Sequence, residues 1–81
     1  MPDDKHRLYL RDLGLTIKQR ALEAVKERDS EPQGSSGRAF QSGRVLALNE
    51  VISIMQQDAE GFGIPLADLQ LGDIVPDKDL V

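Results

Sequence analysis

The sequence predicts an all-α fold: an antiparallel hairpin of two long helices, followed by a short helical turn and an extended C-terminal tail. Apolar residues recur at spacings of three and four along two long segments, which is the pattern of amphipathic helices. A run of turn-forming residues separates the two segments. The first segment is also rich in Leu, Ala, Arg, Lys, Glu and Gln, which favour helices.

The first helix is expected over about residues 3–28. Pro2, Asp3 and Asp4 suit a first turn, and Lys26 and Arg28 suit a last turn, because each charge opposes the helix dipole at its end. One apolar stripe contains Leu10, Leu13 or Gly14, Ile17, Ala21 and Ala24, and a neighbouring stripe contains Leu8, Leu15, Leu22 and Val25.

Gly14 leaves two alternatives for this segment. One helix could end at a glycine cap and a second could restart with Thr16 as N-cap and Gln19 completing a capping box. A glycine inside a helix costs only about 1 kcal/mol. Because the apolar stripe keeps its phase through Gly14, a single helix is the preferred prediction.

Residues 29–37 are expected to form a flexible surface loop, since they contain no large apolar side chain and collect Gly, Ser, Pro and Asp. The stretch Gly34-Ser35-Ser36-Gly37 could suggest a phosphate-binding loop. It lacks a preceding buried strand and a Gly-Lys-Ser/Thr ending, so phosphate binding is not predicted.

The second helix is expected over about residues 38–61 and has the strongest pattern in the chain. Its main stripe is Val45, Leu48, Ile52, Met55, Ala59 and Phe62, and an adjoining stripe is Phe40, Ala47, Val51 and Ile54. Gly61 and Gly63 are each suited to end it in a left-handed conformation.

After this helix, Pro65 is placed to open a short helical turn through Leu69. Residues 72–81 contain too much Pro and Asp for a further helix, so an extended tail is expected. Its apolar side chains are expected to fold back over one end of the helices.

Each long helix has two apolar stripes, and one partner helix can cover only one of them. We therefore expect a homodimer that forms a four-helix bundle, with a tetramer as a further possibility. The competing interpretation is that the tail alone covers the second stripe. The residues expected at helix or dimer interfaces are Leu10, Ile17, Leu22, Phe40, Gly43, Ala47, Leu48, Val51, Ile52, Met55 and Phe62.

The 81 residues are long enough for one domain. There is no cysteine, and His6 is the single histidine, so neither a metal site nor a cofactor is expected. No apolar run reaches the roughly 20 residues that span a bilayer, and the N-terminus lacks the order of a signal peptide. The expected location is the cytoplasm, with no membrane partner and no small-molecule substrate.

Few residues suggest catalysis. Glu50 is the one acidic residue inside the apolar run of the second helix, where it is expected at the interface edge beside Arg20 or Arg44. A polar pocket around Glu50 would be needed for an enzyme or ligand-binding bundle. Ser53 has no neighbouring base, so nucleophilic catalysis is not expected.

Charge is distributed unevenly along the chain. The net charge is −4, yet residues 1–28 carry seven basic and five acidic residues, while residues 45–81 carry one basic and seven acidic residues. The simplest interpretation is that the first and second helices are complementary neighbours. Arg7, Arg11 and Lys18 share one helical side and are candidate contacts for an acidic partner, although nucleic acid is disfavoured because acidic residues are interleaved with them.

The pattern Phe40-x-x-Gly43-x-x-x-Ala47-x-x-Glu50-Val51, followed by Met55, Gln56, Gln57, Ala59, Phe62, Gly63 and Ile64, resembles small uncharacterised bacterial helical-hairpin proteins. The resemblance covers about residues 40–66. It implies a helical hairpin and no activity, cofactor or substrate.

The sequence therefore favours a non-enzymatic protein–protein interaction module or scaffold that acts as a homo-oligomer. The alternative is a small nucleic-acid-associated regulator, antitoxin-like or transcription-associated, that uses the basic face of the first helix. Salt-sensitive binding to DNA or RNA would distinguish the second hypothesis from the first.

Overall fold

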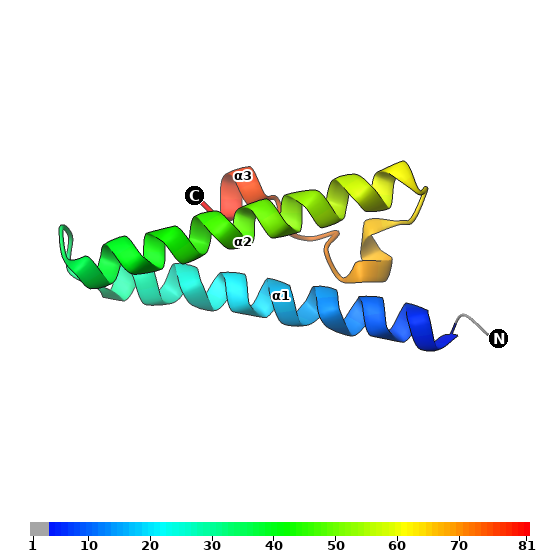
Figure 1. Ribbon diagram of the computed structural model, residues 1–81, viewed down its shortest axis with the longest axis horizontal. Helices are drawn as coiled ribbons and strands as arrows, with labels where there is room; N and C mark the ends of the chain where they lie inside the picture. Colours follow the sequence, from blue (N-terminus) through cyan, green and yellow to red (C-terminus); the bar gives the residue numbers. More distant parts are fainter. Residues whose placement is uncertain (1–3) are drawn as a thin grey trace.

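The computed structural model describes residues 4–81, and over this range the long elements are helices. Helix α1 (Asp4–Ser30) and helix α2 (Ser36–Gly61) lie antiparallel along each other (Figure 1). A 3₁₀ turn, η1 (Leu66–Leu69), and a one-turn helix, α3 (Pro76–Asp79), follow. The molecule is elongated, with extents of 51 × 20 × 16 Å. The prediction of an all-α helical hairpin is confirmed.

Helix α1 is continuous through Gly14, as preferred from the sequence. Gly14 is buried, and a Cβ atom there would overlap the carbonyl oxygen of Leu69 and lie 2.9 Å from its carbonyl carbon. The glycine therefore serves close packing between the backbones of α1 and η1, and it does not break the helix. The alternative of two shorter helices is wrong.

The loop between the long helices is shorter than the expected residues 29–37, because side chains cap both helix ends. Ser35 is the N-cap of α2: its Oγ accepts a hydrogen bond from the Arg38 backbone N–H at 3.1 Å. The Arg38 guanidinium donates to the carbonyl oxygens of Arg28 and Glu31, at 3.1 Å each. These bonds satisfy carbonyls that a helix C-terminus leaves without an internal partner.

The C-terminus of α2 ends as the sequence predicts. Gly63 has φ +70°, the left-handed conformation that glycine adopts readily. The N–H of Gly63 bonds the Glu60 carbonyl oxygen, and the N–H of Ile64 bonds the Ala59 carbonyl oxygen. This Schellman arrangement turns the chain back toward the hairpin.

The core is shared between the hairpin and the C-terminal segment, which we define as residues 64–81. Among residues 4–81, no polar or charged residue is buried. The buried apolar residues are Ala21, Ala24, Val45, Ile52, Ala59, Leu69, Leu71, Ile74 and Leu80. Four of these nine belong to the C-terminal segment. Two of them, Leu71 and Leu80, are among the largest fully enclosed side chains of the whole core. The segment is thus a third layer of the core.

The short turn predicted from Pro65 is present as η1, but the expectation of an extended tail over residues 72–81 is wrong in part. Pro76 begins α3, where its fixed φ suits a first helical position. The Asp79 carboxylate accepts a hydrogen bond from the Val75 N–H at 2.8 Å, which closes the turn. Pro and Asp, taken as helix breakers, here start and cap a single turn.

Two amide side chains on α2 hold the C-terminal segment. The Asn49 amide donates to the carbonyl oxygens of Pro76 and Leu80, at 3.0 and 3.1 Å. One heptad later, the Gln56 amide donates to the carbonyl oxygens of Leu71 and Ile74, at 3.0 and 2.9 Å. The Ser53 hydroxyl donates to the Asn49 amide oxygen at 3.2 Å, which leaves the NH₂ group to face the two carbonyls. Irregular backbone needs such partners when it packs on a helix.

We expect Gly14→Ala to destabilise the fold, although alanine favours a helix more than glycine. The added methyl group would overlap the Leu69 carbonyl and push η1 away, a cost of about 1–3 kcal/mol for overpacking. Urea unfolding would measure the change. Gly43→Ala is the matched control, because nothing lies within 4 Å of a Cβ atom there. The control should gain up to about 1 kcal/mol. Equal stabilisation by both changes would contradict the packing role of Gly14.

We expect Asn49→Asp to release α3, because a carboxylate cannot donate to the two carbonyl oxygens. The loss should be about 1–3 kcal/mol. Hydrogen exchange would show faster exchange at the amides of Lys78, Asp79 and Leu80. Gln57→Glu adds the same charge at an exposed position on the same helix and should leave these amides protected. Unchanged protection in both variants would contradict the anchoring role of Asn49.

Candidate functional site

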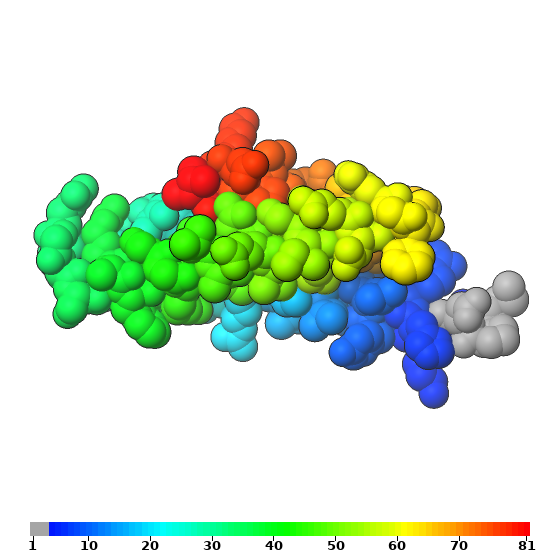
Figure 2. Space-filling view, turned by 45° about the horizontal axis from the view of Figure 1, so that its top comes forward, coloured from blue at the N-terminus to red at the C-terminus, as the bar shows by residue number. Residues whose placement is uncertain are grey.

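The C-terminal segment covers only one side of the hairpin. Its anchors on α2 are Asn49 and Gln56, and on α1 Lys18 bonds Asp73 and Arg28 bonds the Val81 carbonyl oxygen. In Figure 2 the red end of the chain lies above α2 and the blue N-terminal part of α1 lies below it, while the surface of α2 that faces the viewer is uncovered. The hairpin therefore has a covered side and an open side.

The open side carries an apolar groove of about 430 Å³ between α1 and α2. Its lining is almost entirely hydrophobic, with Asp58 as the one charged residue. The lining residues from the two helices and the turn after α2 are Leu10, Leu13, Ile17, Val51, Met55, Asp58, Ala59, Phe62, Ile64 and Leu69. Phe62, at 82% exposure, lies at the end of α2 and is the most exposed large hydrophobic residue among those described.

Further hydrophobic residues extend this surface along α2. Phe40 and Ile54 are exposed. Phe40 and Ala47 precede Val51 and Ile54 comes after it, at spacings that place all four on one side of the helix. We call the groove residues together with Phe40, Ala47 and Ile54 the open face. An exposed apolar surface of this kind marks an interaction site in a folded protein.

The residues predicted at interfaces divide into three groups. Ile52 is fully enclosed in the chain's own core, and Ile17, Leu48 and Met55 are half-buried against that core. The others are exposed: Leu10, Leu22, Phe40, Gly43, Ala47, Val51 and Phe62. Leu22 is one helical turn from Lys18 and so lies toward the covered side, apart from the open face.

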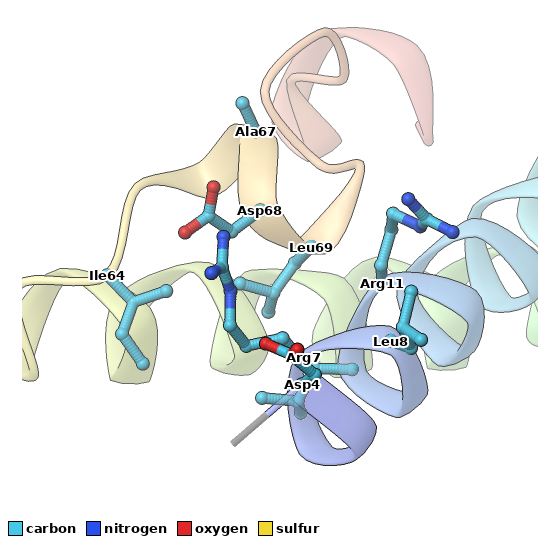
Figure 3. A pocket seen from close by; sticks show the side chains of 9 residues that line it. Asp4, Arg7, Leu8, Arg11, Ile64, Ala67, Asp68 and Leu69 are labelled. Carbon is cyan, nitrogen blue, oxygen red and sulfur yellow. The ribbon is translucent and has the colours of Figure 1, made fainter. Parts of the chain in front are cut away.

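A second pocket, of about 710 Å³, lies at the open end of the hairpin between the start of α1 and η1 (Figure 3). Arg7 and Arg11, two of the candidate contacts for an acidic partner, line it together with Asp4 and Asp68. The two cations therefore share their surroundings with two carboxylates. Such balanced charge gives little attraction for a polyanion.

Lys18, the third candidate cation, lies elsewhere and is engaged within the chain. Its Nζ is 2.9 Å from the Asp73 carboxylate, and its side chain is only 13% exposed. The hydrogen bond from Lys18, reinforced by the lysine's positive charge, lowers the pKa of Asp73 below its ordinary value of 3.8. This ion pair joins α1 to the C-terminal segment, and not to α2 as the charge pattern had suggested.

The residues considered for chemistry are dispersed. His6 and Glu50 are exposed, and the Ser53 hydroxyl bonds Asn49. Arg44, expected beside Glu50, instead bonds Glu27 at 2.6 Å, so this pairing was wrong. Within residues 4–81, no group of three or more His, Cys, Asp or Glu side chains is arranged to hold a metal ion. No helix in the same range is long and apolar enough to cross a membrane.

Comparisons with protein-family models, curated proteins and solved structures gave no significant match to this chain. The resemblance of residues 40–66 to bacterial helical-hairpin proteins therefore stays a hypothesis.

Sequence reasoning missed the residues that decide which side of the hairpin stays open. Asn49 and Gln56 are spaced by one heptad at the edge of the apolar stripe of α2. Two amides at this spacing can each donate two hydrogen bonds to carbonyl groups that pack alongside the helix. The signal was present in the sequence, but its interpretation required knowing that residues 71–80 return to α2.

We expect the Lys18–Asp73 pair to stabilise the fold at neutral pH and to lose this effect in acid. Because the pKa of Asp73 is lowered in the folded state, its contribution is complete above pH 3.8 and is lost as the pH falls through the lowered value. Asp73→Asn should therefore be less stable than wild type at pH 7, and the difference should vanish in strong acid. Denaturant unfolding at a series of pH values measures this. Glu50→Gln removes another exposed carboxylate as a control, and an identical pH profile for both variants would contradict the pairing.

Proposed function

We propose that this protein is a non-enzymatic protein–protein interaction module that works as a homodimer and buries its open face against a second copy. The observation that carries the proposal is the apolar groove between α1 and α2, whose lining includes the exposed side chains of Val51 and Phe62. Burial of apolar surface contributes about 25 cal/mol per Å², so covering this face favours association.

The composition of the open face supports a protein partner. Apart from Asp58, the groove offers no charged group to orient a small polar substrate. Exposed aromatic side chains at both ends of α2, Phe40 and Phe62, are the residue type that anchors protein interfaces. A second helical surface fits a long shallow groove between two helices better than a compact ligand does.

The nucleic-acid alternative has weaker support. It requires Arg7, Arg11 and Lys18 to act together on phosphates. Lys18 bonds Asp73, and the two arginines share their pocket with Asp4 and Asp68. We therefore place the apolar interface ahead of the basic face of α1.

Sedimentation equilibrium of the wild-type chain at micromolar concentration tests the proposal, and a dimer is expected. Val51→Glu would place a carboxylate in the centre of the open face and should weaken association by about 100-fold or more, because a buried unpaired charge costs several kcal/mol. Leu46→Glu is the matched control: Leu46 is an exposed hydrophobic residue of the same helix, about 140° around the axis from Val51. This control should remain dimeric.

A wild-type chain that is folded and monomeric at these concentrations would overturn the proposal. Circular dichroism of both variants verifies that the helices persist, so that a loss of association is not confused with a loss of folding.

A further inference from the structure

The side of α2 that carries most of the open face has an internal symmetry centred on Val51. We define nine residues of this side as the Val51 stripe, which adds Arg44 and the half-buried Leu48 to residues of the open face. In chain order they are Phe40, Arg44, Ala47, Leu48, Val51, Ile54, Met55, Asp58 and Phe62. Steps of three and four residues keep these positions on one side of the helix, and the groove itself contains Val51, Met55, Asp58 and Phe62. Each residue of the stripe before Val51 has a counterpart the same number of positions after Val51.

This symmetry matters for a two-fold dimer. When two copies of one helix pack antiparallel across a two-fold axis, a residue n positions before the centre meets the residue n positions after it on the other copy. With the centre at Val51, the pairs are Phe40 with Phe62, Arg44 with Asp58, Ala47 with Met55, and Leu48 with Ile54. Any helical side has such equidistant positions, but nothing in helical geometry makes their side chains complementary.

The charges are complementary in this register. Arg44 and Asp58 are each about 10 Å from Val51 along the helix axis, so the two form opposite-charge pairs twice across the dimer. Arg44 Nη1 already bonds Glu27 and Gln41, and the remaining N–H donors of its guanidinium, on Nε and Nη2, can bond a second carboxylate. A parallel arrangement would instead place Arg44 against Arg44 and Asp58 against Asp58. Electrostatics therefore select the antiparallel orientation.

The shapes are complementary too. The segment that lies opposite residues 51–62 in this register is residues 40–51 of the second copy. Phe40, which is 66% exposed in its own chain, would lie in the groove beside Phe62. A small residue, Ala47, stands opposite the long side chain of Met55. An aromatic anchor in a partner's groove and small-to-large pairing are features of packed interfaces.

We propose that two copies of this chain pack α2 against α2, antiparallel and centred on Val51, with Phe40 of each copy seated in the groove of the other and Arg44 of each copy paired with Asp58 of the other. This register rests on the proposed homodimer and specifies its orientation and contacts.

A charge-exchange experiment on the full chain tests the register by sedimentation equilibrium. Asp58→Arg alone creates two arginine–arginine contacts, and Arg44→Glu alone creates two carboxylate contacts. Each should weaken the homodimer by about tenfold or more. An equimolar mixture of the two variants restores both opposite-charge pairs and should form a heterodimer about as tight as the wild-type dimer. Glu50→Arg is the matched control for Asp58→Arg, since Glu50 is exposed on α2 outside the Val51 stripe.

Disulfide crosslinking provides a second readout that does not depend on charge. The chain has no cysteine, so Val51→Cys introduces a single thiol per copy, and at the two-fold axis this thiol meets its own counterpart. Val51→Cys should crosslink to itself rapidly under mild oxidation. Glu50→Cys, one residue away, should remain unlinked.

The outcomes separate the two proposals. A monomeric wild-type chain overturns the homodimer and this register with it. A wild-type dimer that tolerates Asp58→Arg as well as it tolerates Glu50→Arg, or that crosslinks no better through Val51→Cys than through Glu50→Cys, overturns the register and leaves the homodimer standing. Recovery of association in the mixture, together with crosslinking at Val51, supports both.

Discussion

The fold depends on supplying hydrogen-bond partners for the irregular backbone after α2. Residues 71–80 pack on the hairpin with little regular structure of their own, and each carbonyl group that is buried without a donor costs about 1–3 kcal/mol. Asn49 and Gln56 supply those donors from a single side of α2. The position of these two amides therefore decides which side of the hairpin the segment covers and which side remains open.

The hairpin by itself is a poor core, which explains why this third layer is needed. On α1 the fully buried side chains are only those of Ala21 and Ala24, which let the helices approach closely but enclose little apolar volume. Leu71 and Leu80 from the C-terminal segment add two large enclosed side chains to Val45 and Ile52 of α2. Gly14 also contributes to close packing, since the absence of a Cβ atom lets the backbone of Leu69 approach α1. A short chain thus gains a layered core without a disulfide.

The sequence was sufficient to predict the parts of the fold that depend on local periodicity and end signals. The heptad spacing of Val45, Ile52 and Ala59 predicted the buried line of α2, and Gly63 predicted its end. Contacts between residues distant in the sequence were harder to predict. Gly14 and Leu69 are distant in sequence, so the reason for the glycine appeared only when the turn was seen against it. Local composition also misled at Pro76 and Asp79, because the residues that disfavour a long helix are the ones that begin and close a single turn. The open face was predicted as excess apolar surface, but its location required knowing where the tail packs.

The two sides of α2 differ in the kind of interaction that they carry, and this difference bears on specificity. The covered side uses directional hydrogen bonds to named carbonyl groups, which only the chain's own segment offers in that geometry. The open side uses hydrophobic residues with a charge near each end of the Val51 stripe, and apolar contact alone does not discriminate between partners. In the proposed dimer, discrimination comes from Arg44 and Asp58, because a wrong partner or a wrong orientation would place one of them against a like charge. The central residues of the stripe would then supply affinity, and the two flanking charges would set the orientation.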